Sequence, residues 1–174
     1  MEEVVLVNPK DDEVGTMEKM EAHLNGVLHR AFSVLVYNNK GEMLLQKRAH
    51  TKYHSGGLWT NACCSHPRPD ESNAAAAKRR LIEELGINAE PEYLYKFIYK
   101  AKLDNNLTEH EYDHVYTCIT DQEPLLNKAE AEDYKYVEMT DLFNDVDKNP
   151  DSYTVWFRMI VDKLKNRLEI TARQ

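Results

Sequence analysis

The segment "TNACCSHP", at residues 60–67, places two adjacent cysteines just before a histidine. Cys63, Cys64 and His66 are candidates for a metal site, a redox pair, or one reactive thiol beside a metal-bound imidazole. Adjacent cysteines lack the C-x-x-C spacing of dithiol oxidoreductases, which argues against the redox pair. Neighbouring side chains of an extended segment point to opposite sides, so we expect Cys63 and Cys64 to have different surroundings.

Histidines and glutamates elsewhere in the chain are candidates for binding one divalent ion together with His66. His23 and His29 lie in "HLNGVLHRAFS", and Glu109 and Glu111 lie in "EHE". Because side chains alternate along a strand, the two glutamates should point the same way. Imidazole and carboxylate ligands together suit zinc, manganese or magnesium. A single histidine is more often an ordinary surface or core residue, so this hypothesis requires the segments to meet in space.

The stretch from Ser65 to Ile87 resembles the Nudix box, written G-x5-E-x7-R-E-U-x-E-E-x-G-U. The matching positions are Glu71, Arg79, Leu81, Glu83, Glu84, Gly86 and Ile87. Ser65 replaces the first glycine, and Arg80 replaces the first glutamate of R-E-U. Nudix hydrolases use the carboxylates of this helix to hold the magnesium that assists attack on a diphosphate. A cation at position 80 therefore weakens the interpretation as a hydrolase.

Arg80 and Glu84 are four residues apart, so they share one face of the predicted helix. That face could offer a guanidinium to a diphosphate and a carboxylate to its magnesium. The alternative is an ordinary surface ion pair, which stabilises a helix by only about 0.3–0.5 kcal/mol.

Composition limits the classes of function. The 174 residues fit one domain, which we place at 1–174, and the three cysteines cannot build a disulfide framework. The net charge of −8 argues against nucleic-acid and anionic-membrane partners, but it is compatible with a small phosphorylated ligand. The apolar run "VVLV" is too short for a signal peptide or a membrane span. We therefore expect a cytoplasmic protein, and its oligomeric state stays open.

Local patterns predict a mixed α+β protein with one central helix packed on a sheet and further helices beside it. Asp70 and Ser72 before four alanines, with Gly86 after them, predict a helix from about 72 to 85. Alternating or continuous apolar runs predict strands near 31–37 and 42–48, over 57–64, in a hairpin of 92–103 with 109–120, and over 134–139. A short helix is predicted at 140–146 and an amphipathic helix at 152–168.

Several segments together carry a more specific resemblance. They are "LHRAFSVLVYN", "LLQKRA", "WTNACCSHP", the modified box, "TEHEYD" and "YTVWF", spread from about residue 15 to 157. In this order they resemble the type 1 isopentenyl-diphosphate isomerases, a family with the Nudix fold. The resemblance implies a reversible shift of a carbon–carbon double bond between isopentenyl and dimethylallyl diphosphate, through a tertiary carbocation, which feeds isoprenoid biosynthesis.

The resemblance also implies roles for individual residues. Glu111, assisted by Tyr99, would deliver a proton to the terminal methylene carbon, and Cys64 would remove one from the allylic carbon. The return reaction exchanges these roles. Cys63 would then be a small buried filler.

Two metal sites and a substrate site follow from the same resemblance. The ligands of a magnesium, manganese or zinc ion would be His23, His29, His66, Glu109 and Glu111. A second ion, magnesium, would bridge the diphosphate to Glu84 and the backbone oxygen of Cys64. The cations that bind the diphosphate would be Lys19, Arg48, Lys52 and Arg80. Trp156 would face the carbocation, although an amphipathic helix alone predicts a core tryptophan there.

Two other hypotheses about the function stay open. A Nudix hydrolase of a nucleoside diphosphate derivative is compatible with Glu83 and Glu84. A catalytically silent module that holds a structural metal ion is a third hypothesis. The remaining histidines have no assigned role and are expected to be surface or packing residues; they are His50, His54, His110 and His114.

Overall fold

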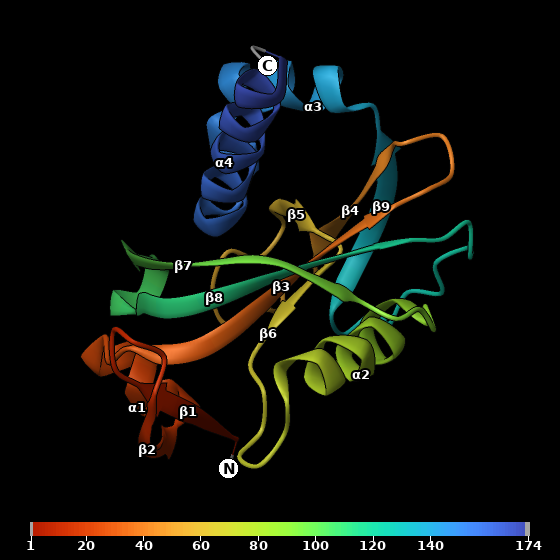
Figure 1. The fold of residues 1–174 in the computed structure, drawn as a ribbon. Helices are drawn as coiled ribbons and strands as arrows, with labels where there is room; N and C mark the ends of the chain where they lie inside the picture. Colours follow the sequence, from red (N-terminus) through yellow and green to blue (C-terminus); the bar gives the residue numbers. More distant parts are fainter. Residues whose placement is uncertain (1, 173–174) are drawn as a thin grey trace.

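A mixed nine-stranded sheet forms the centre of the computed structural model, which describes the backbone of residues 2–172 and the side chains as far as Arg167 (Figure 1). The strands are β1 (Glu3–Val7), β2 (Glu13–Glu18), β3 (His29–Tyr37), β4 (Met43–Arg48), β5 (Trp59–Asn61), β6 (Cys63–Ser65), β7 (Glu92–Lys102), β8 (Thr108–Ile119) and β9 (Ala131–Val137). Along one path the order is β2-β1-β3-β4-β5; β6 and β8 also pair with β3, β7 pairs with β8, and β9 pairs with β4.

The strand β3 organises the sheet because it has several partners. It runs parallel to β8, with His29 opposite Glu111, and antiparallel to β6, with Ser33 opposite Cys64. Six consecutive residues of β3, from Ala31 to Val36, are buried, and all are apolar except Ser33, as expected for a strand covered on both faces. This register brings "HRAF", "CCSHP" and "EHE" side by side.

The helices lie on two sides of the sheet. They are α1 (Lys19–Asn25), α2 (Asn73–Leu85), α3 (Met139–Lys148) and α4 (Val155–Ala172), with 3-10 turns at Asp104–Asn106 and Pro150–Ser152. Figure 1 shows α2 on one side and α3 with α4 on the other. The Ser72 hydroxyl caps α2 by accepting from the Ala75 amide, and Gly86, with a φ of 64°, ends it in the left-handed region.

Two hydrophobic cores follow from the alternation of side chains along the strands. Val34 and Leu44 pack with Leu81 of α2. Leu35 and Leu45, their neighbours in sequence, pack on the other side with Phe157 of α4 and its surroundings. Each buried side chain of this size contributes about 1.5–3 kcal/mol relative to an exposed one, so both sides of the sheet help to hold the strands in register.

The predicted fold class is confirmed, and the differences have local causes. The expected strand over 57–64 is two strands, because β5 pairs with β4 whereas β6 pairs with β3. The predicted helix at 152–168 begins later, at Val155, because Tyr153 is extended and forms a bridge with Trp59. The hairpin of β1 and β2 and the helix α1 were not predicted. All but the last two residues of β2 are exposed, so no apolar periodicity marks it.

Candidate active site

Three histidines and a glutamate from distant segments converge in the interior. The residues are His23 on α1, His29 at the start of β3, His66 just after β6 and Glu111 on β8. All four are buried, and their candidate ligand atoms lie within 4.8 Å of one another. His66 Nε2 is 3.2 Å from His29 Nε2 and 3.0 Å from Glu111 Oε1. Four side chains expected to bind one ion are therefore close enough to do so.

The hydrogen bonds of two histidines define which nitrogen faces this group. His23 Nδ1 is 2.7 Å from the Lys19 carbonyl oxygen, and His29 Nδ1 is 2.8 Å from that of Val27. A carbonyl oxygen only accepts, so each Nδ1 donates its hydrogen. In the neutral imidazole of His23, Nε2 then keeps a free lone pair. His23 Nε2 is buried without a hydrogen-bond partner among the described residues. A divalent metal ion fits this set of donors, and it would satisfy that nitrogen.

A tyrosine connects the two glutamates. The Tyr99 hydroxyl is 2.9 Å from Glu109 Oε2 and 2.6 Å from Glu111 Oε2. Burial raises the pKa of Glu109 well above its usual range, and the charge of Glu111 raises it further. Burial also opposes ionisation of Glu111, but hydrogen bonds from His29 and His66 hold its pKa well below the usual range. These surroundings therefore favour a negative charge on Glu111 more than on Glu109.

Cys64 lies near this group on the neighbouring strand. It is half-buried and lines the same cavity as Glu111 and Tyr99. Burial raises the pKa of its thiol, so the sulfur carries its proton at neutral pH. Cys63 points into the core beneath α2, where it is fully buried and its thiol donates to Glu84 Oε1 at 3.4 Å. The predicted difference between the two cysteines is confirmed.

The Arg80–Glu84 pair is part of the interior and not an ordinary surface ion pair. Arg80 donates from Nε and from a terminal nitrogen to Glu84 Oε1, at 3.1 and 2.7 Å, and Glu84 is only 3% exposed. Burial lowers the pKa of Arg80, but Glu84, Cys63 and Glu130 together outweigh burial, and the net shift is upward. Gln46 donates to the other oxygen of Glu84 at 3.0 Å. This arrangement keeps Arg80 charged and fixed in direction.

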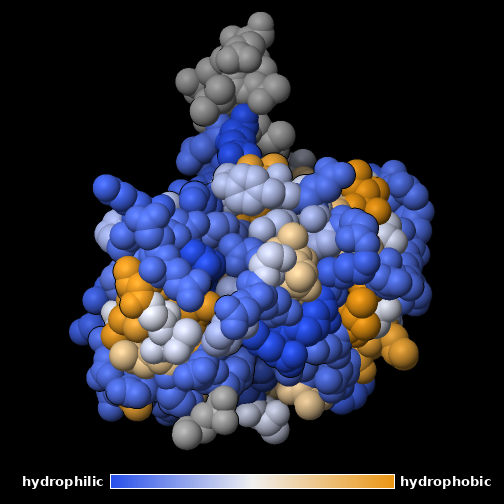
Figure 2. Space-filling model, turned by 60° about the horizontal axis from the view of Figure 1, so that its bottom comes forward, coloured by the Kyte–Doolittle hydropathy of each residue, from blue (hydrophilic) through white to orange (hydrophobic). Residues whose placement is uncertain are grey.

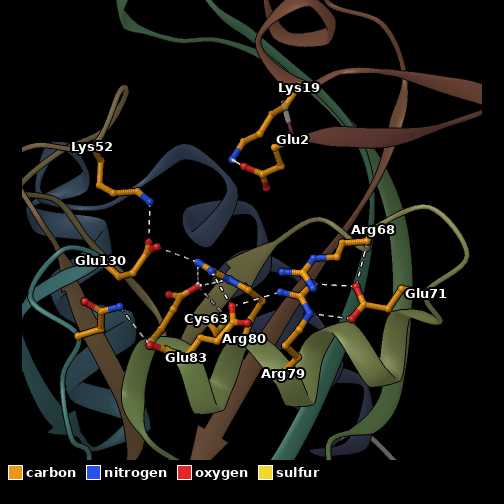
Figure 3. Close-up of polar contacts among 12 residues, drawn as sticks. Glu2, Lys19, Lys52, Cys63, Arg68, Glu71, Arg79, Arg80, Glu83 and Glu130 are labelled. Carbon is orange, nitrogen blue, oxygen red and sulfur yellow. Dashed lines mark hydrogen bonds and ion pairs between the residues drawn. The ribbon is translucent and has the colours of Figure 1, made fainter.

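An acidic residue outside the box links two of the predicted diphosphate cations. Figure 3 shows Lys52 and Arg80 both pointing toward Glu130. Lys52 Nζ is 2.6 Å from Glu130 Oε2, and Arg80 is 3.1 Å from Glu130 Oε1. No spacing in the sequence identifies Glu130, because it precedes β9, far along the chain from α2.

One cavity collects most of the predicted site residues. Its empty volume is about 650 Å³, part of which is open to solvent. The predicted residues that line it are Lys19, Arg48, Lys52, Cys64, His66, Arg80, Tyr99, Glu109, Glu111 and Trp156. The other predicted residues, His23, His29 and Glu84, are buried and do not line it. Trp156 is 2% exposed, and the Arg48 guanidinium lies 5.2 Å from the centre of its ring. Trp156 is thus both a core residue and a wall of the cavity.

One histidine that the sequence did not single out belongs to this region. His54 is 4% exposed, lines the cavity, and places Nε2 3.4 Å from Glu109 Oε1. Burial lowers its pKa to about 3, and the charge of Arg48 contributes. His114 is also buried, where it pairs with Asp11, whereas His50 is exposed. Nothing in the loop "HTKYHSGG", at residues 50–57, distinguishes His54 from its exposed neighbour His50.

Hydrophilic residues cover most of the face seen in Figure 2, and hydrophobic residues form small separate groups. None of the described helices combines the length and apolar character needed to cross a bilayer.

The comparisons with known proteins agree with this geometry. The NUDIX domain family model matches residues 27–158. Among solved structures, one of a Deinococcus radiodurans protein has a TM-score of 0.75 at 16% identity and covers 93% of this chain and 98% of its own. A MutT protein from Methanosarcina mazei has a TM-score of 0.67 at 19% identity, covering 80% and 94%. The chain is therefore a NUDIX-domain protein.

Curated relatives define the family more narrowly. Isopentenyl-diphosphate Delta-isomerase 2 from Photorhabdus laumondii is 51% identical over 94% of this chain and 93% of its own length. The protein of the same name from Aromatoleum aromaticum is 47% identical, covering 94% and 86%. The isomerase from Serratia proteamaculans is 43% identical, covering 99% and 97%. The chain belongs to the isopentenyl-diphosphate Delta-isomerase family.

Proposed function

We propose that this protein interconverts isopentenyl diphosphate and dimethylallyl diphosphate. The observation that carries the proposal is that one cavity is lined by the Cys64 thiol, by the Tyr99–Glu111 pair and by four cations. The names of the curated relatives support the same reaction. The Nudix box of the hydrolases has a glutamate where Arg80 stands, and Arg80 pairs with Glu84.

The reaction moves one proton onto the substrate and takes another away. A proton added to the terminal methylene carbon creates a tertiary carbocation, and loss of a proton from the allylic carbon leaves its electron pair as the new double bond. An alkene is a weak base, so the acid and the base must be positioned on either side of it. Cys64 and Glu111 are the two proton-transfer residues, with Tyr99 as the partner of Glu111.

The pKa shifts of Cys64 and Glu111 define the protonation form from which one direction of the reaction would start. Cys64 is protonated and Glu111 is ionised, so in this form the thiol donates and the carboxylate accepts. One turnover leaves the opposite form, in which Glu111 with Tyr99 donates and Cys64 accepts. This second form is the one that the sequence predicts for the conversion of isopentenyl diphosphate. The metal ion that His23, His29, His66, Glu109 and Glu111 would hold supplies charge that orients Glu111 and tunes its acidity.

The binding of substrate uses both ends of the cavity. Its diphosphate would contact the cations that line the cavity, which are Lys19, Arg48, Lys52 and Arg80. Glu84 and the backbone oxygen of Cys64 would hold a magnesium ion, which would supply charge to neutralise the diphosphate. The ring of Trp156 would face the carbocation, an attraction worth up to ~2 kcal/mol when desolvated. Because Arg48 already lies over that ring, diphosphate binding would also draw a competing cation away from it.

The proposal is tested by incubation with isopentenyl diphosphate in heavy water. We expect deuterium in the substrate and accumulation of the dimethylallyl isomer, without release of phosphate. Cys64→Ala should lower the rate by about 10²–10⁴-fold, the usual contribution of general acid–base catalysis. Cys118→Ala is the matched control, because Cys118 is buried but does not line the cavity. Full activity in Cys64→Ala would refute the assigned role.

A further inference from the structure

His54 is held in a defined position by its neighbours in the loop and by the core. Its carbonyl oxygen accepts a hydrogen bond from Arg48 at 3.1 Å, and its Nδ1 is 3.2 Å from the Ser55 hydroxyl. The edges and faces of aromatic rings enclose its imidazole, with ring centres 4.4 Å away for Tyr53 and 5.8 Å away for Trp156. These contacts aim Nε2 toward Glu109.

The distance from His54 to Glu109 suits two ligands of one ion better than a hydrogen bond. His54 Nε2 lies 3.4 Å from Glu109 Oε1, whereas N–H···O bonds cluster near about 2.9–3.0 Å. Two ligand atoms that are each about 2.1 Å from a metal ion are about 3.0–3.4 Å apart at octahedral or tetrahedral angles. His54, Glu109 and His23 form a buried group whose candidate ligand atoms all lie within 4.8 Å of one another.

His23 supplies a second, independent sign of a ligand. Its Nε2 is buried, carries a lone pair and has no hydrogen-bond partner among the described residues. Its ring is stacked against that of His54, with centres 6.2 Å apart. His23 also belongs to the group with His29, His66 and Glu111, so the two groups adjoin. An imidazole nitrogen binds one ion at a time. One ion bound to His23 Nε2 would therefore take its ligands from both groups.

We propose that His54 is a further ligand of the metal centre, bringing a fourth imidazole to it on the side of Glu109. The proposal rests on the metal centre of the proposed function and deepens it. Its chemical consequence is selectivity, because each added nitrogen donor favours zinc or cobalt(II) over magnesium. The ligands predicted from the sequence contain three imidazoles, and His54 is absent from them.

The test measures metal binding directly. Metal-free wild type, His54→Ala, His54→Gln and His50→Ala would be titrated with cobalt(II), following the visible absorption bands and competition with a chromophoric chelator. His50→Ala is the matched control, because His50 lies in the same loop but is exposed and pairs with Glu132. We expect wild type and His50→Ala to be identical. Both His54 variants should bind cobalt(II) about 10–100-fold more weakly and with altered bands.

The outcomes distinguish the proposed role of His54 from the proposed metal centre on which it depends. If wild type binds no cobalt(II), the metal centre itself is wrong. If all four proteins bind with equal affinity, only the role of His54 is overturned. A loss of affinity with unchanged absorption bands also overturns it, because His54 would then only orient Glu109. Circular dichroism and thermal unfolding in chelator would establish that His54→Gln, which retains most of the side-chain volume, is folded.

Discussion

The two parts of the proposed site, the diphosphate end around Arg80 and the metal end around His66, are built in different ways. At the diphosphate end, Arg80 and Glu84 lie on one helix and contact each other across a single turn. At the metal end, the histidines and Glu111 come from four separate elements. A local pair of this kind forms as soon as α2 forms, whereas the metal group requires β3, β6, β8 and α1 to be in place. The first can be recognised from spacing, and the second only from a folded structure or a family resemblance.

The two ends also differ in how far their polar groups are satisfied. Glu84 accepts hydrogen bonds from Arg80, Gln46 and Cys63. His23 Nε2, by contrast, has no partner among the described residues. A diphosphate bound by these cations would therefore compete with carboxylates for them, whereas a metal ion would satisfy a nitrogen that is otherwise unpaired. We infer that the diphosphate end is built to bind and release its ligand, whereas the metal end is built to retain its ion.

The largest expected effect separates chemistry from binding. Glu111→Gln removes the carboxylate that exchanges a proton, so turnover should fall by about 10²–10⁴-fold. Affinity for the diphosphate, measured by calorimetry, should change little, because the predicted diphosphate cations remain. His110→Gln is the control, since His110 precedes Glu111 on β8 and contacts the Gly26 carbonyl instead. Equal losses of binding and turnover would contradict a division of labour between the ends. Metal content is measured in parallel.

A smaller effect is expected at the diphosphate end. Arg80→Lys keeps the charge but replaces a planar fork by a single ammonium group, which cannot contact Glu84, Glu130 and a diphosphate together. The KM for isopentenyl diphosphate should rise by about tenfold, with kcat nearly unchanged. Arg79→Lys is the matched control, because Arg79 pairs with Glu71 and does not line the cavity. A fall in kcat alone would place Arg80 in the chemistry.

The smallest effect concerns acid stability. Burial opposes ionisation of Glu130, but Lys52 and Arg80 hold its pKa below the usual value. A carboxylate with a lowered pKa stabilises the folded state above its unfolded pKa of 4.5 and loses that contribution as the pH falls through its folded pKa. The free energy of unfolding of Glu130→Gln in urea should therefore depend less on pH below about 4.5 than that of wild type. Glu92→Gln, exposed on β7, should follow wild type.

Sequence reasoning succeeded where local chemistry determines structure. Capping by Ser72 and Gly86 defines α2, and alternation defines the opposite surroundings of Cys63 and Cys64. It failed where burial depends on distant packing. His54 and His50 occupy one loop, yet only His54 is enclosed, because Trp156 from α4 packs against it. The predicted roles of the site residues came from a family resemblance, and the structure adds their distances and burial.

The parallel pairing of β3 with β8 has a consequence for assembly of the protein. His29 and Glu111 face each other on strands that are separated in the sequence by β4, β5, β6, α2 and β7. Joining strands so far apart in the chain costs loop-closure entropy that is recovered only when both cores have packed. The ion site should consequently arise among the last events of folding. Ion retention would then report that a newly made chain has reached its native state.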